Sequence, residues 1–123
     1  MPVRVLIADD HRLFAEALEA VLSSEPRIEV VGRASDGGEA VELARQLQPD
    51  LVVLDISMPV LDGFEAAAAL EGLHPSPAVL MLTGSNSPDD IDRARRTGVK
   101  GYITKDAIAA SLVDAILDAA QSR

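Results

Sequence analysis

The chain has 123 residues, 48% of them hydrophobic and 25% charged, with a formal net charge of -9 and no cysteine. This length and composition are those of one globular domain with a single core, and the absence of cysteine excludes disulfides and thiolate metal sites. The negative charge repels phosphate backbones and only 2% of the residues are aromatic, so this domain is not expected to bind nucleic acid directly.

Apolar strand-like runs alternate with amphipathic helical stretches along the chain. Unbroken Val, Ile and Leu runs are typical of strands buried on both faces, and we expect strands at residues 3–8, 28–34, 51–54, 78–82 and 101–103. Apolar residues at helical spacing predict helices near residues 14–22, 40–47, 64–68, 91–94 and 108–119, with the weakest pattern at 91–94. These elements predict an α/β domain with a doubly wound, five-stranded parallel sheet and five helices on its two faces.

Four polar residues stand just before predicted helices, and they are Asp10, Asp36, Asp62 and Ser87. Side chains of these types accept hydrogen bonds from the free N–H groups of the first helical turn. We therefore expect them to be N-caps. Pro88 would then take the first helical position, which needs no N–H donor.

Three aspartates end two of the predicted strands: Asp9 and Asp10 follow the first, and Asp55 follows the third. Parallel strands bring their carboxyl ends to one edge, which is where open α/β sheets bind ligands. Three carboxylates crowded at that edge repel one another unless a cation lies among them. We therefore expect a hard divalent metal beside a reactive aspartate.

Two further strand ends bring a hydroxyl and an ammonium group to the same edge. Thr83 and Gly84 follow the fourth strand, and Lys105 follows the fifth. Mg²⁺ binds one or two carboxylates together with water and phosphate oxygens, and a lysine supplies a point charge for phosphate. A carboxylate can also act as a nucleophile and form an aspartyl phosphate. The set therefore indicates phosphoryl chemistry, in which positioning and charge neutralisation provide most of the catalysis.

With these residues in place, the chain resembles the receiver domain of bacterial two-component response regulators over essentially its whole length. The matching segments are Asp9 with Asp10, residues 55–63 (DISMPVLDG), Thr83 with Gly84, and residues 101–106 (GYITKD). The opening DDHRLF and the GYITKD segment are most similar to NarL/FixJ (LuxR-type) regulators, which usually combine a receiver with a helix-turn-helix DNA-binding domain. One departure is Asp106, which follows Lys105 where many receivers have proline.

The resemblance implies a flavodoxin-like fold with strand order 2-1-3-4-5 for a receiver domain that spans residues 1–123. Asp55 would accept a phosphoryl group from the phosphohistidine of a sensor histidine kinase. Mg²⁺ would be bound directly by Asp10 and Asp55, by Asp9 chiefly through water, and by the backbone carbonyl of Ser57. The domain would then be a switch that promotes its own phosphorylation and dephosphorylation, with no turnover of an external substrate.

The resemblance also assigns a second group of residues to catalysis and switching. Lys105 would pair with the phosphoryl group, Thr83 would turn its hydroxyl onto a phosphoryl oxygen, and Tyr102 would change rotamer with Thr83. Phosphorylation replaces one negative charge with about two and adds three acceptor oxygens. The readout would be the face formed by the fourth helix, fifth strand and fifth helix, roughly residues 88–121, and phosphorylation could produce a homodimer.

Simpler interpretations exist for individual residues. Asp9 and Asp10 are the kind of acidic pair that caps a helix, and Thr83 and Tyr102 are ordinary strand residues. We interpret His11 as a first-turn helical histidine that faces solvent rather than as a metal ligand. The remaining histidine, His74, lies in a proline-containing loop and suggests no function.

Three other functions are compatible with an α/β sheet. A haloacid-dehalogenase-like phosphohydrolase needs a second acidic residue two positions after its nucleophile, where this chain has Ser57. A flavin-binding electron carrier needs a hydroxyl- and glycine-rich loop after the first strand, together with aromatic residues to hold the flavin. A phosphorylation-independent interaction module with a receiver fold stays open, although the complete acidic set argues against it.

Location and domain organisation follow from the remaining features. No apolar run approaches the roughly 20 residues of a membrane span, and the N-terminus lacks the pattern of a signal peptide. We expect a cytoplasmic protein that makes no membrane contact. The sequence stops where the fifth helix should finish, so we expect either a stand-alone receiver or one excised from a longer protein. The NarL/FixJ resemblance favours excision from a regulator whose helix-turn-helix domain controls transcription.

Overall fold

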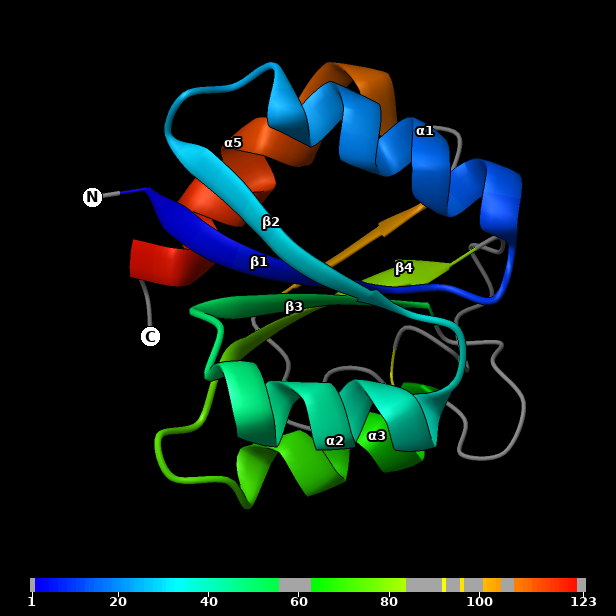
Figure 1. Ribbon diagram of the computed structural model, residues 1–123, viewed down its shortest axis with the longest axis vertical. Helices are drawn as coiled ribbons and strands as arrows, with labels where there is room; N and C mark the ends of the chain where they lie inside the picture. The colour runs from blue at the N-terminus through cyan, green and yellow to red at the C-terminus, as the bar shows by residue number, and fades with distance from the viewer. Residues whose placement is uncertain are drawn as a thin grey trace.

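A five-stranded sheet forms the centre of the molecule (Figure 1), and its neighbouring strands pair in parallel in the order β2-β1-β3-β4-β5. The computed structural model describes residues 2–55, 63–83, 92, 96, 101–104 and 108–121. The strands are β1 (Val3–Ala8), β2 (Ile28–Ala34), β3 (Leu51–Asp55), β4 (Ala78–Thr83) and β5 (Gly101–Thr104). The predicted parallel sheet and its strand order are confirmed.

Helices cover both faces of this sheet (Figure 1), with α1 and α5 on one face and α2 and α3 on the other. Their bounds are α1 (Arg12–Ser23), α2 (Gly37–Leu47), α3 (Gly63–Glu71) and α5 (Ile108–Gln121). These are four of the five predicted helices, and the helix expected at residues 91–94 lies almost wholly outside the described residues. Among the residues described, no helix is long and apolar enough to cross a membrane.

Alternate residues of each central strand belong to two separate cores. In β1, Val5 and Ile7 join the core beneath α1 and α5, whereas Leu6 and Ala8 join the core beneath α2 and α3. All four are fully buried. Each large apolar side chain buried in this way contributes about 1.5–3 kcal/mol. The unbroken apolar runs therefore reflect a sheet that is covered on both sides, which fixes its strand ends firmly.

The N-cap of α2 was predicted correctly. The carboxylate of Asp36 accepts a hydrogen bond from the backbone N–H of Glu39 at 2.7 Å, and the Glu39 carboxylate accepts one from the backbone N–H of Ser35 at 3.0 Å. These two bonds satisfy donors that the start of a helix leaves free. Asp36 follows β2, so this cap also fixes the connection at the carboxyl edge of the sheet.

The predicted N-cap of α1 is wrong by one residue. The N-cap is His11 rather than Asp10, and the His11 side chain makes no capping hydrogen bond to α1 within the described part of the chain. The reason is local, because the Asp9 carboxylate accepts a bond from the backbone N–H of His11 at 2.8 Å. That turn delays the helix by one residue and leaves Asp10 at the sheet edge. The other two predicted caps, Asp62 and Ser87, lie outside the described residues, as does Pro88.

We predict that Asp36→Ala lowers the free energy of unfolding by about 1 kcal/mol, the usual cost of removing an N-cap. Chemical denaturation monitored by circular dichroism measures this change. Gln46→Ala is the matched control, because Gln46 is an exposed residue of the same helix whose side chain donates a hydrogen bond to exposed Glu42. A loss of equal size in both variants would contradict the capping role of Asp36.

Candidate functional site

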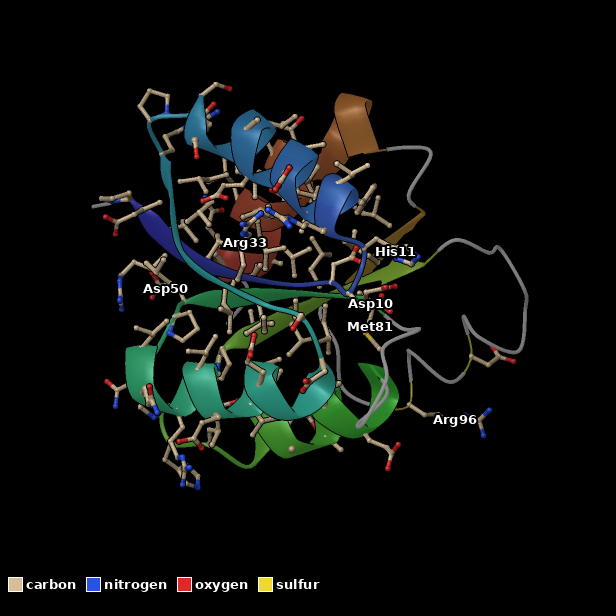
Figure 2. All side chains as sticks on the ribbon, turned by 45° about the vertical axis from the view of Figure 1, so that its right-hand side comes forward. Asp10, His11, Arg33, Asp50, Met81 and Arg96 are labelled. Atoms are coloured by element: carbon tan, nitrogen blue, oxygen red, sulfur yellow. The ribbon has the colours of Figure 1, made fainter. Side chains whose placement is uncertain are left out.

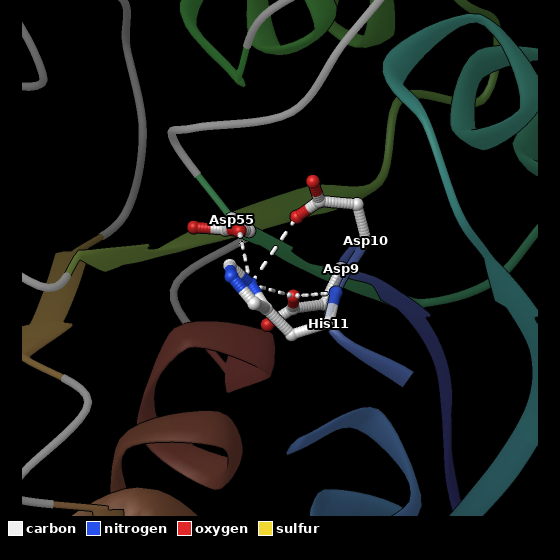
Figure 3. Close-up of side chains that lie close together, drawn as sticks. All are labelled: Asp9, Asp10, His11 and Asp55. Atoms are coloured by element: carbon white, nitrogen blue, oxygen red, sulfur yellow. Dashed lines mark hydrogen bonds and ion pairs between the residues drawn. The ribbon is translucent and has the colours of Figure 1, made fainter. Parts of the chain in front are cut away.

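Asp9, Asp10 and Asp55 come together at one edge of the sheet (Figure 3). β1 and β3 are neighbours with Ala8 opposite Leu54, so the next residues, Asp9 and Asp55, leave the sheet side by side. Asp9 is 3% exposed and Asp55 is 1% exposed, and they are the buried charged residues of the described chain. The sequence therefore predicted correctly that the three aspartates share one edge.

The carboxylates are close enough to act on a single ion. One ligand atom each from Asp9, Asp10, Asp55 and His11 can be chosen so that all four atoms lie within 4.8 Å of one another. Burial removes the water that would otherwise screen the repulsion among the charges. A divalent cation relieves that repulsion, and carboxylate oxygens are the ligands that Mg²⁺ prefers. The three carboxylates thus fit a hard divalent metal.

His11, which the sequence interpretation set aside as a histidine that faces solvent, lies beside the carboxylates. Its Nδ1 lies 3.2 Å from Asp9 Oδ1, 3.2 Å from Asp10 Oδ1 and 3.9 Å from Asp55 Oδ2 (Figure 3). Its side chain is 63% exposed, as expected for a residue that faces solvent, but the ring nitrogen turns toward the carboxylates. Its place directly after two aspartates was a hint of a metal ligand, but the sequence does not give the direction of the ring.

Asp50, an aspartate outside the acidic cluster, has a structural role. Asp50 lies at the opposite end of the sheet from Asp10 and His11 (Figure 2). One of its oxygens accepts a hydrogen bond from the backbone N–H of Arg4 at 2.9 Å, which ties the start of β3 to β1. Asp50 therefore has an evident structural role, whereas the close approach of three carboxylates is unfavourable and the backbone bond of Asp9 does not require it.

The other predicted site residues are described only in part. Thr83 ends β4, one residue beyond Leu82, which pairs with Asp55. Tyr102 lies in β5 opposite Met81. The strand positions of Thr83 and Tyr102 are described and their side chains are not, while Ser57 and Lys105 lie outside the described residues. The roles assigned to these four residues stay predictions.

A depression opens beside the acidic cluster, between α1, β2 and the start of α2. Asp9 and Asp10 line one part of it, and Arg12, Arg33 and Glu39 contribute further charged groups. Solvent and small ions therefore reach the cluster from this side.

A family profile described as "Response regulator receiver domain" matches residues 5–117. The chain belongs to this family. Curated relatives include the transcriptional regulatory protein DegU of Brevibacillus brevis, 36% identical over 97% of this chain and 50% of DegU. The probable transcriptional regulatory protein NarL of Mycobacterium tuberculosis is 37% identical over 98% of this chain and 56% of NarL. The chain thus spans about half the length of these relatives.

Solved structures agree with this assignment. The signal receiver domain of the M. tuberculosis response regulator NarL superposes with a TM-score of 0.94 at 37% identity, covering 99% of this chain and 98% of that one. The response regulator domain of Thermotoga maritima CheB gives a TM-score of 0.90 at 32% identity, covering 98% of each chain. The expected resemblance to NarL-type regulators is therefore confirmed. Receiver domains bind Mg²⁺ at an acidic site, and the described cluster supplies such a site.

We predict that Mg²⁺ raises the thermal stability of the wild-type domain and that Asp10→Asn loses most of this gain. A ligand bound only by the folded state stabilises it by about 2.7 kcal/mol at one hundred times its dissociation constant. Thermal unfolding in a Mg²⁺ series measures the effect, with EDTA as the zero point.

Glu29→Gln is the matched control, because Glu29 is an exposed acidic residue near the start of β2, at the other end of the sheet. Its Mg²⁺ response should equal that of the wild type. An equal response in Asp10→Asn would place the ion outside the acidic cluster.

Proposed function

We propose that this receiver domain is a phosphorylation-activated switch in which Asp55 accepts a phosphoryl group from the phosphohistidine of a sensor histidine kinase. The observation that carries the proposal is the position of Asp55, which is 1% exposed at the end of β3 beside Asp9 and Asp10. A carboxylate that ends a buried strand has few conformations, so its oxygen is held ready for in-line attack. The membership of the family supports the same role.

The proposed reaction moves one phosphoryl group from the kinase histidine to Asp55, and positive charges at the site would neutralise the negative charge of that group. An Asp55 oxygen forms the new bond to phosphorus as the bond from phosphorus to the kinase histidine nitrogen breaks, and that nitrogen keeps the electron pair. Mg²⁺ would be held by Asp9, Asp10, Asp55 and the Ser57 carbonyl, and when bound it supplies positive charge for the phosphoryl oxygens. Lys105 would provide a second positive charge.

Switching follows from the new charge on Asp55. The Thr83 hydroxyl would gain a phosphoryl oxygen as a partner, and Tyr102 would follow by changing rotamer. A contact of this kind can shift an equilibrium between two states that differ by only a few kcal/mol. The affected surface would be the one around β5 and α5, through which a homodimer could form.

The output is proposed from the relatives. DegU and NarL are named as transcriptional regulatory proteins and are about twice as long as this chain. We therefore infer a cytoplasmic regulator in which a helix-turn-helix DNA-binding domain, fused or partner, controls transcription. The receiver itself would turn over no external substrate.

We predict that acetyl phosphate with Mg²⁺ adds one phosphoryl group to the wild-type chain and none to Asp55→Asn. An amide oxygen at this position is a far weaker nucleophile than a carboxylate. Intact-mass spectrometry at low temperature measures the gain, and EDTA should abolish it.

A phosphorylated histidine kinase provides the second donor for this test. A wild-type chain that gains nothing from either donor would be a phosphorylation-independent module instead. A gain that persists in Asp55→Asn would move the phosphoryl group to another residue.

We predict that Lys105→Ala slows phosphorylation of Asp55 by about a hundredfold, the usual loss when one charge-stabilising group is removed from a transition state. Lys100→Ala is the matched control, since Lys100 is the chain's other lysine and stands outside the GYITKD segment. Single-turnover transfer from acetyl phosphate measures both rates. Equal rates in the two variants would remove Lys105 from the reaction.

A further inference from the structure

We propose that His11 is a fourth ligand of the acidic site, so that the site selects divalent ions that bind nitrogen, such as Ni²⁺ and Zn²⁺, over Mg²⁺. This inference rests on the metal site of the proposed function and adds an imidazole to its three carboxylates. The four ligand atoms, one of them from His11, lie within 4.8 Å of one another.

The distances between the ligand atoms fit a common metal. Two ligands about 2.1 Å from one ion lie about 3.0 Å apart when they are at right angles and about 4.2 Å apart on opposite sides. The His11 Nδ1 lies 3.2 Å from Asp9 Oδ1, 3.2 Å from Asp10 Oδ1 and 3.9 Å from Asp55 Oδ2. All three nitrogen–oxygen separations fall between the two limits. The four ligand atoms together lie within 4.8 Å of one another, so an ion that bound all of them would draw the carboxylate oxygens slightly closer.

The backbone holds His11 beside the carboxylates. The His11 N–H donates to Asp9 Oδ1 at 2.8 Å, and its carbonyl accepts the first hydrogen bond of α1 from Ala15 at 2.9 Å. The residue is therefore fixed on both sides, between the end of β1 and the start of α1. With 63% of its side chain exposed, the ring lies on the solvent side of the cluster. Figure 3 shows the ring between the side chains of Asp10, Asp55 and Asp9.

The chemistry of the ligands determines which ions benefit. Imidazole suits Zn²⁺, Ni²⁺ and Cu²⁺, whereas Mg²⁺ prefers oxygen ligands and keeps several of its waters. Ni²⁺ would use His11 together with the carboxylates. Mg²⁺ would use the carboxylates alone, with the ring turned aside toward solvent. The same cluster would therefore bind both kinds of ion, and His11 would set the ratio of their affinities.

The test is isothermal titration of the unphosphorylated chain with NiCl₂ and, separately, with MgCl₂ at one fixed pH, on protein purified without a histidine tag. The variants are His11→Ala and His11→Phe, the second of which keeps a ring but lacks the nitrogen. We expect both to lose Ni²⁺ affinity by about tenfold or more, while Mg²⁺ affinity stays within about twofold or rises. Circular dichroism checks that both variants fold.

His74→Ala is the matched control, because His74 is the chain's other histidine and lies exposed between α3 and β4, far from the cluster in the sequence. Its Ni²⁺ and Mg²⁺ affinities should equal those of the wild type. A loss of Ni²⁺ affinity in His74→Ala comparable to that of the His11 variants would overturn the proposal.

Two further results would also overturn it. Unchanged Ni²⁺ affinity in the His11 variants would remove the nitrogen from the coordination sphere. Equal losses for Ni²⁺ and Mg²⁺ would mean that His11 only arranges the carboxylates. In both cases, Mg²⁺ binding by the wild type would still support the proposed switch function. A wild type that binds neither Ni²⁺ nor Mg²⁺ would contradict the metal site on which the switch and the role of His11 both depend.

Discussion

The parallel pairing of β1 with β3 places Asp9 and Asp55 side by side in the interior, and the site depends on this one contact. Burying neighbouring carboxylates is unfavourable, and the cost must be offset by cations, by hydrogen bonds or by stability elsewhere. The two cores supply that stability, since residues 5–8 of β1 and 51–54 of β3 are fully buried apolar side chains. The apolar strands are therefore what allows the acidic edge to exist.

Most of the sheet could be predicted because its strands are buried on both faces and their residue types show it. The predicted ranges of β3, β4 and β5 each stop one residue short of the observed end, at Asp55, Thr83 and Thr104. Backbone pairing continues through these polar residues, and hydrophobicity reports the side chain rather than the backbone hydrogen bond. The polar residues that end these strands also lie at the ligand-binding edge of the sheet. The predicted strand ends are therefore wrong at the residues whose side chains are expected to bind ligands rather than to pack in a core.

The acidic cluster could be predicted from strand ends alone, whereas the position of His11 could not. N-cap preferences favour aspartate over histidine, which made Asp10 the better candidate for the start of α1. The choice was decided by the side chain of Asp9, whose hydrogen bond to the His11 N–H turns the chain before the helix begins. A preference measured one residue at a time does not include such a competition between neighbours.

Exposure divides the site into a floor and a rim with different physical roles. Asp9 and Asp55 form the floor, where burial strengthens every charge interaction and the fold leaves little freedom. Asp10 and His11 form the rim, with side chains 31% and 63% exposed, and an ion arriving from solvent meets them first. A change on the floor alters the sheet as well as the chemistry, because the floor residues continue two central strands. A change on the rim would leave the strands in place, so Asp10 and His11 are the residues at which the proposed choice of ion can be tested without altering the sheet.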